Sequence, residues 1–175
     1  MKEMELVGLR QHENIGVPIM LLKEPDGQER ILPIFIGKSE ALAIALALEG
    51  VVSPRPMTHD LMASLIGTSG MELSRVEIVD LEDRTFFAEL EFCRKGEEDN
   101  AFRISSRPSD AIALAIRMDA PVFAVDKVLD EAGFVPSEDE EMEDETDEEQ
   151  PEEVIEQFKE FIDNVSAEDF EASKG

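Results

Sequence analysis

A seven-residue pattern occurs twice in this chain, and the two copies start seventy positions apart. The first copy, residues 39–45, reads S-E-A-L-A-I-A, and the second, residues 109–115, reads S-D-A-I-A-L-A. Each copy has a hydroxyl residue, an acid and then alanines alternating with aliphatic residues, a composition that favours a short helix packed closely against its neighbours. A strand-like segment precedes each copy. The repeat therefore predicts two related half-domains, each with strands followed by an alanine-rich helix.

The rest of the pattern predicts an α+β fold with antiparallel or mixed sheets. Alternation is clearest at 85–94, which we interpret as the middle strand of an antiparallel meander over 71–105. Pro33 lies inside a predicted strand and indicates a sheet edge or a bulge. Ser39 and Thr58 are the expected N-caps of the first two helices. We expect further strands at 4–10, 17–22, 30–36 and 121–125, and helices at 39–48, 58–66, 109–118 and 126–132.

Charge divides the chain into two parts. The formal net charge is −26, of which residues 1–136 carry −10 and residues 137–175 carry −16. The first part, which we interpret as the folded domain, lacks the broad basic footprint of proteins that bind nucleic acid without sequence preference. Cys93 is the one cysteine, which excludes an intramolecular disulfide. No apolar stretch reaches the ~18 residues of a membrane span, and the acidic N-terminus is unlike a signal peptide. We therefore expect a cytoplasmic protein without a membrane partner.

The acidic tail divides further. Residues 137–150 are dense in acids and are expected to form a disordered linker. Residues 151–165 carry an apolar stripe at helical spacing and predict an amphipathic helix, which would dock on the body, on a neighbouring subunit or on a protein partner. Residues 166–175 are expected to be a disordered end. The stripe consists of Val154, Ile155, Phe158, Phe161 and Ile162.

Two arginine–proline pairs each precede an expected helix start. Arg55 is followed closely by His59 and Asp60, and Arg107 is followed by Asp110. A guanidinium binds phosphate through planar donors, and backbone N–H groups at a helix start receive anions. Histidine transfers protons near neutral pH. We therefore take Arg55 and Arg107 as candidate substrate-binding residues, and His59, Asp60 and Asp110 as candidate catalytic residues.

The acids near these helix starts are also candidate metal ligands. Hard divalent cations such as Mg²⁺ and Mn²⁺ prefer carboxylate oxygens. Asp60 and Asp110 are the first candidates, and Glu40, beside Lys38, is a third. Together with the arginines and the histidine, these residue types point to metal-assisted hydrolysis of a phosphodiester, with Mg²⁺ or Mn²⁺ as the expected cofactor.

A structural interpretation competes with the catalytic one. Acids in the first turn of a helix stabilise it by about 0.3–1 kcal/mol each through the helix dipole, and hydroxyl residues there are ordinary caps. In this interpretation Arg55 pairs with Asp60 and Arg107 pairs with Asp110 as structural salt bridges. Residue types alone do not distinguish the two.

Three runs of the sequence resemble one known family. They are R-I-L-P-I-F-I-G-K-S-E-A-L-A-I at 30–44, R-P-M-T-H-D-L at 55–61 and R-P-S-D-A-I-A-L-A at 107–115. In this order and spacing they are similar to the bifunctional nuclease domain family, and the resemblance covers about residues 1–136. The extended acidic tail resembles that of the actinobacterial form of the family.

The resemblance implies an α+β fold with two related halves, a homo-oligomer of at least two subunits, and nuclease activity on DNA and RNA. Two functional hypotheses follow. The first is a divalent-metal-dependent nuclease acting through the residues named above. The second is a non-catalytic oligomeric binding or regulatory module, in which the same motifs are helix caps and interface salt bridges.

Overall fold

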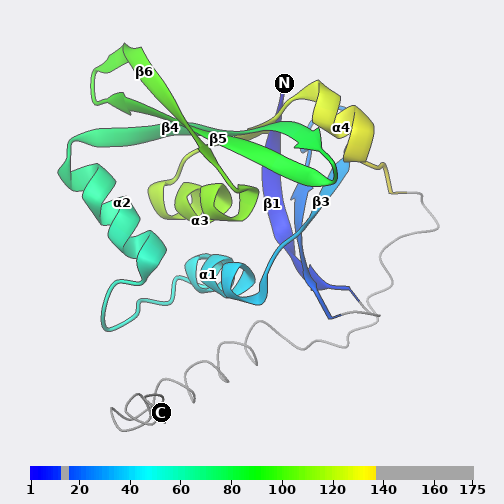
Figure 1. The fold of residues 1–175 in the computed structure, drawn as a ribbon, viewed down its shortest axis with the longest axis horizontal. Coiled ribbons are helices and arrows are strands. Elements are labelled where there is room, and N and C mark those ends of the chain that lie inside the picture. The colour runs from blue at the N-terminus through cyan, green and yellow to red at the C-terminus, as the bar shows by residue number, and fades with distance from the viewer. Residues whose placement is uncertain (13–15, 137–175) are drawn as a thin grey trace, which may run out of the picture. The chain divides into compact units, whose positions relative to one another are not determined.

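The computed structural model of the chain describes residues 1–12 and 16–136. The strands are β1 (Lys2–Gln11), β2 (Pro18–Lys23), β3 (Ile31–Phe35), β4 (Met71–Glu82), β5 (Thr85–Arg94), β6 (Glu97–Ser106) and β7 (Val122–Ala124). The helices are α1 (Lys38–Leu48), α2 (Thr58–Thr68), α3 (Pro108–Met118) and α4 (Asp126–Ala132). The predicted strands and helices named above are confirmed to within two residues at each end. The fold is α+β, as predicted (Figure 1).

The described strands form one mixed sheet of seven strands in the order β3-β2-β1-β7-β4-β5-β6. Strands β1, β2 and β3 form an antiparallel meander that leads into α1, and β4, β5 and β6 form a second that leads into α3. The short strand β7 joins the two meanders, antiparallel to β1 and parallel to β4. The prediction of two related strand–helix halves is therefore confirmed, and each repeat helix follows an edge strand. Pro33 lies on the edge strand β3, where its missing N–H is tolerated.

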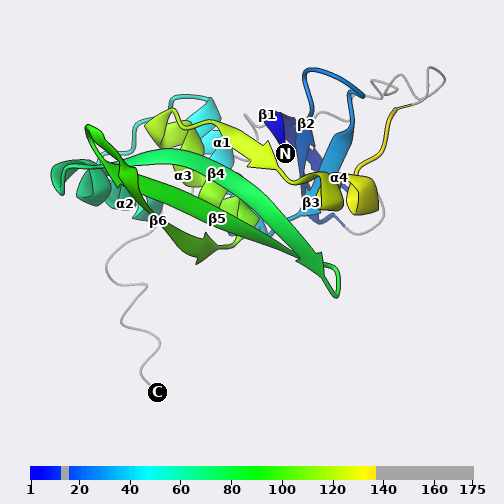
Figure 2. The same cartoon turned by 90° about the horizontal axis from the view of Figure 1, so that it is seen from above.

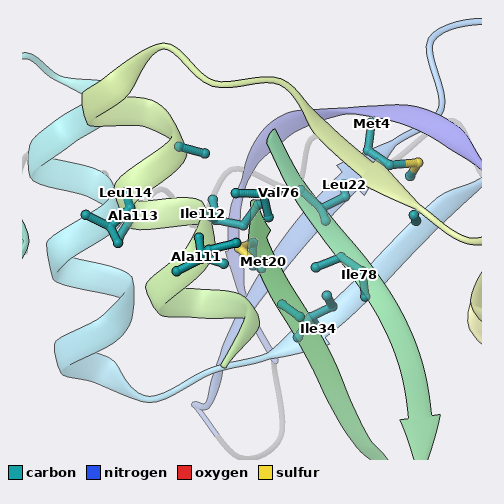
Figure 3. Close-up of a cluster of buried hydrophobic side chains, with 14 of the residues drawn as sticks. Met4, Met20, Leu22, Ile34, Val76, Ile78, Ala111, Ile112, Ala113 and Leu114 are labelled. Carbon is teal, nitrogen blue, oxygen red and sulfur yellow. The ribbon is translucent and has the colours of Figure 1, made fainter. Parts of the chain in front are cut away.

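Helix α3 occupies the centre of the fold. It packs against α1, α2, β4 and β5, and Figures 1 and 2 show α1, α2 and α3 on one side of β4 and β5. Ile112 and Leu114 are almost completely buried, and full burial of one such side chain contributes about 1.5–3 kcal/mol. Figure 3 shows Ile112 beside Val76 of β4 and Met20 of β2. The alternating residues Ala111, Ala113 and Ala115 are also buried, and their small side chains leave room for neighbouring elements to pack against the helix.

The predicted N-caps are wrong by one or two positions. The N-cap residues are Gly37 for α1 and Met57 for α2, so both helices begin earlier than a hydroxyl cap would place them. At α2 the cause is visible, because the Met57 N–H donates to the Asp60 carboxylate at 2.9 Å. The Ser39 hydroxyl instead donates to Glu40. At these helix starts the carboxylates of Asp60 and Glu40, rather than the hydroxyls of Thr58 and Ser39, therefore accept hydrogen bonds from backbone N–H groups.

A buried ion network ties the first three strands to α4. Glu24, in the turn after β2, is 1% exposed. Its Oε2 accepts a hydrogen bond from Arg30 Nε at 2.9 Å, and its Oε1 lies 3.2 Å from Lys2 Nζ. Arg30 Nη1 also donates to Asp130 Oδ1 of α4 at 2.8 Å. The Arg30 hydrogen bond lowers the pKa of Glu24 below its ordinary value of 4.5, although burial opposes this. The ionised carboxylate therefore favours the folded chain.

The predicted linker at 137–150, the amphipathic helix at 151–165 and the end at 166–175 lie outside the described residues. Within residues 1–12 and 16–136, none of the helices is both long and apolar enough to cross a membrane.

The contribution of the Glu24 carboxylate to the free energy of unfolding can be tested by substitution. Glu24→Gln removes the charge that offsets Arg30 inside the protein, so we expect the free energy of unfolding at pH 7 to fall by about 2 kcal/mol. Because the folded pKa is lowered, the contribution of the wild-type carboxylate is complete above about pH 5 and is lost as the pH falls through the folded value. The two proteins should therefore converge in stability in acid, as measured by urea unfolding at a series of pH values.

The matched control for this experiment is Glu29→Gln. Glu29 is exposed and pairs with Lys23 at 3.5 Å, so its substitution should change the free energy of unfolding by less than about 0.5 kcal/mol. A difference between wild type and Glu24→Gln that stays constant down to pH 3 would contradict the assignment.

Candidate active site at the start of helix α3

Four side chains from three separate segments meet at the start of α3. Arg107 binds the Asp110 carboxylate with two N–H groups, at 2.7 Å from Nε and 3.1 Å from Nη2. Its Nη1 donates to Glu40 Oε1 of α1 at 3.1 Å. His59 Nε2 of α2 lies 3.1 Å from Asp110 Oδ1. We call Glu40, His59, Arg107 and Asp110 the His59 cluster. The packing of α1 and α2 against α3 brings these residues together from distant parts of the sequence.

The His59 cluster lines a cavity of about 570 Å³ between the three helices and β6. We call it the first cavity. All four members of the cluster border it, and the Arg107 side chain is 65% exposed, so the guanidinium is accessible to a ligand. Hydroxyl and apolar side chains complete the lining, among them Ser39, Ser105, Ser106, Met57, Met62 and Ile104.

Charge in the cluster determines the tautomer of the histidine. Burial raises the pKa of Asp110, but hydrogen bonds from Arg107 and His59 outweigh it, so the pKa lies below its ordinary value. The carboxylate is therefore ionised near neutral pH and can only accept hydrogen bonds, so His59 Nε2 must carry the proton that it shares with Asp110. His59 Nδ1 contacts no partner among the described residues. In the neutral ring Nδ1 is an unprotonated base.

Glu40 is held ionised by its own surroundings. The hydrogen bond from its own backbone N–H is the largest cause of its lowered pKa, followed by the Ser39 hydroxyl, and Arg107 adds to both. The side chain is 20% exposed. Glu40 thus faces the guanidinium as a fixed negative charge on the wall of the first cavity.

Asp60 lies apart from the His59 cluster. Its Oδ1 accepts a hydrogen bond from Arg117 Nε at 2.6 Å, and its Oδ2 accepts the Met57 N–H. Burial raises the pKa of Asp60, but the hydrogen bonds from Arg117 and Met57 lower it by more, so the pKa lies below its ordinary value. Arg117 is seven residues after Asp110 in α3, about 10 Å along the axis. Asp60 and Asp110 therefore have separate cationic partners, and Asp60 attaches α2 to the last turn of α3.

The two predicted salt bridges have different outcomes. Arg107 pairs with Asp110, as the structural interpretation expected. The expected pair of Arg55 with Asp60 is wrong, because the Asp60 carboxylate forms its ion pair with Arg117. Arg55 is exposed on the loop before α2 and forms no ion pair with the residues that the structure describes. Sequence reasoning missed Arg117, although its spacing from Asp110 placed it on the same face of the helix.

The donor set does not fit a divalent cation in this arrangement. Asp60, Asp110 and Glu40 each have their oxygens engaged by a guanidinium and by further hydrogen bonds. Among residues 1–12 and 16–136, no three or more His, Cys, Asp or Glu side chains are grouped for a metal ion. A bound Mg²⁺ would first have to displace arginine from these carboxylates.

Comparison with known proteins places this site in a family. The bifunctional nuclease domain model matches residues 20–137, a span that contains the whole His59 cluster. An uncharacterized protein of Mycobacterium tuberculosis is 44% identical over 177 residues, which cover 99% of this chain and 100% of that protein.

Plant relatives match over a shorter region. Bifunctional nuclease 1 of Oryza sativa subsp. japonica is 25% identical over 114 residues, 65% of this chain and 34% of that protein. Bifunctional nuclease 2 of Arabidopsis thaliana is 27% identical over 103 residues, 59% of this chain and 31% of that protein. The chain thus spans about a third of the length of these plant proteins. Since the family model matches well over half of the chain and includes the site at the start of α3, this protein belongs to the bifunctional nuclease domain family.

Proposed function

We propose that the protein is a nuclease that hydrolyses phosphodiester bonds of DNA, RNA or both in the first cavity, in the cytoplasm. The observation that carries this proposal is the contact of His59 Nε2 with Asp110 Oδ1 at 3.1 Å, beside the exposed guanidinium of Arg107. An oriented imidazole and a phosphate-binding cation in one cavity suit this reaction. Membership of a family whose plant relatives are named bifunctional nucleases supports the same class of activity.

Each member of the His59 cluster has a role in this proposal. Asp110 orients His59 and holds the proton on Nε2, so that Nδ1 accepts a proton from the attacking water or ribose hydroxyl. A guanidinium has five N–H donors, and Arg107 uses three of them on Asp110 and Glu40. The remaining two are available to the phosphate. Glu40 positions Arg107 from the opposite side.

Arg55 and the metal remain parts of the proposal outside the cluster. Arg55 is exposed, so it is available to contact a phosphate beyond the first cavity. A bound Mg²⁺ or Mn²⁺ would neutralise phosphate charge, but it would first have to displace arginine from the carboxylates, so no step of the proposal depends on it. Because the carboxylates predicted to hold it are paired with arginines, the roles above are assigned to protein side chains alone.

A second candidate function is the non-catalytic oligomeric module. One observation favours it: α2 contributes no buried residue to the core and exposes Leu61 by 51% and Leu65 by 61%, with Met62 beside them. A second copy of the chain would cover such an apolar face, and the paired carboxylates would then be purely structural. The two functions are compatible, since an oligomer can also carry the site.

The proposed acid–base pair predicts the effect of two substitutions. His59→Ala removes the base, and Asp110→Asn removes the acceptor that orients it, so each should lower the rate of oligonucleotide cleavage by about 10²–10⁴-fold. Cleavage of labelled single-stranded DNA and RNA by the purified full chain measures this. Asp80→Asn is the matched control, because Asp80 pairs with Lys127 and neither residue lines the first cavity, and its rate should equal wild type. Wild-type rates in folded His59→Ala protein would contradict the proposal.

Asp60 separates the acid–base assignment from the metal assignment. Asp60→Asn weakens the tie between α2 and α3, so we expect a loss of about 1 kcal/mol in stability and a rate within about threefold of wild type at 20 °C in the presence of EDTA. Thermal unfolding and cleavage assays measure the two effects. Complete loss of cleavage in folded Asp60→Asn protein, together with inhibition of wild type by EDTA, would support the metal role instead.

The oligomeric module predicts a change in mass. If a second copy covers α2, the double substitution Leu61→Glu and Leu65→Glu should convert an oligomer into a monomer, because it would place charges in an apolar interface. Light scattering coupled to gel filtration measures the mass. Ser64→Glu on the same helix tests charge alone. A wild-type monomer at all concentrations would contradict a role for this face.

A further inference from the structure

A second cavity, of about 410 Å³, adjoins the first. The two share Glu40 and Arg107 in their linings, so Arg107 borders both cavities. The second cavity is bordered by the end of β3, by the β4–β5 turn and by the start of α3. The nuclease proposal uses only the first cavity. A strand of nucleic acid that passes Arg107 would extend from one cavity into the other.

Arg84 lines the second cavity from the β4–β5 turn. Glu82 pairs with Thr85 across this turn, so Asp83 and Arg84 alone form the loop. Both have left-handed backbone conformations, with φ of 47° and 64°. Glycine and asparagine suit such two-residue turns, and an arginine there is conformationally unfavourable. The turn does not need arginine for its own geometry, which points to a role for the side chain.

Arg84 has no ion-pair partner in the described part of the chain, although Glu82 and Asp83 precede it in the sequence. It is exposed. Arg107, the other cation that lines either cavity, faces two carboxylates. In a domain with a net negative charge, a cation left free at a cavity attracts an anionic ligand.

Phe35 supplies an aromatic surface in the same cavity. It lies at the end of the edge strand β3 and is 55% exposed, and Phe86 lines the cavity with it. The ring lies against His12, with the ring centroids 5.8 Å apart, and burial in the core does not explain the rest of its exposure. Nucleic-acid bases stack on such rings irrespective of sequence, provided that the base is not paired in a duplex.

We propose that the second cavity is a subsite for the nucleotide next to the scissile phosphate, in which Arg84 binds that nucleotide's phosphate and Phe35 stacks its base. This proposal rests on the proposed nuclease function. Its consequence is a preference for single-stranded oligonucleotides over small phosphodiesters, since only a substrate longer than one nucleotide reaches both cavities.

The test uses Arg84→Gly in the full chain. Glycine relieves the left-handed conformation, so the variant should melt a few degrees above wild type, which excludes unfolding as a cause of lost binding. The KM for a fluorescein-labelled single-stranded 12-mer should rise about tenfold. Hydrolysis of bis(p-nitrophenyl) phosphate, which fits the first cavity alone, should change by less than about twofold. Arg94→Gly, at the exposed end of β5 and outside both cavities, is the control and should leave both substrates unaffected.

Phe35 tests the stacking part separately. Phe35→Leu keeps an apolar side chain but loses the ring, so the KM for the 12-mer should rise about fivefold, whereas Phe35→Trp should restore it. Equal KM values for wild type and Arg84→Gly, or equal losses in Arg84→Gly and Arg94→Gly, would overturn the subsite.

Fluorescence anisotropy distinguishes failure of the subsite from failure of the nuclease proposal. If wild type cleaves neither substrate, the nuclease proposal fails, but the affinity for the labelled 12-mer still reports on the second cavity. Arg84→Gly should then weaken binding about tenfold relative to wild type and Arg94→Gly, and a labelled duplex of the same sequence should bind less tightly than the single strand. Unchanged affinity in Arg84→Gly would overturn the subsite independently of catalysis.

Discussion

Burial of helix α3 is the constraint on which the rest of the structure depends. Ile112 and Leu114 lose almost all contact with solvent, and the small alanines that alternate with them, Ala111, Ala113 and Ala115, allow α1 and the sheet to pack against the helix. A helix enclosed in this way exposes polar groups only at its ends. Its N-terminal end reaches the surface with Arg107 and Asp110, and the neighbouring helices then place Glu40 and His59 against them. The candidate active site is a consequence of how the core is packed.

Charge compensation shapes this site. An acidic domain repels a phosphate backbone over roughly a Debye length, about 8–10 Å at physiological salt. Arg107 offsets one of the two carboxylate charges nearest to His59, and Arg84, which forms no ion pair with the described residues, adds a second cation in the adjoining cavity. The local balance along the two cavities is therefore less negative than that of the domain. Under the proposed function, this local balance would reduce the repulsion of an anionic substrate.

Much of the fold was predictable because it depends on local pattern. Strict alternation at Thr85–Arg94 predicted β5, and the doubled alanine-rich run predicted α1 and α3. The N-caps were mispredicted, since an acid three residues into α2 competes successfully with the hydroxyl of Thr58 for the helix start. The predicted partner of Asp60 was wrong for a similar reason. Arg55 is close to Asp60 in sequence, but the packing of α2 on α3 brings Arg117 to the Asp60 carboxylate instead.

The amino-acid sequence by itself determined the two strand–helix halves, the acidic balance of the chain, and the residue types at the helix starts, because these follow from periodicity and composition over a few residues. Only the tertiary structure decided which of those residues meet. His59 joins Asp110 while its neighbour Asp60 turns to Arg117, and Arg84 comes to line a cavity beside Arg107. The physical reason is that side-chain contacts across packed elements depend on helix rotation and sheet order, which the burial of the whole core sets and no local segment contains.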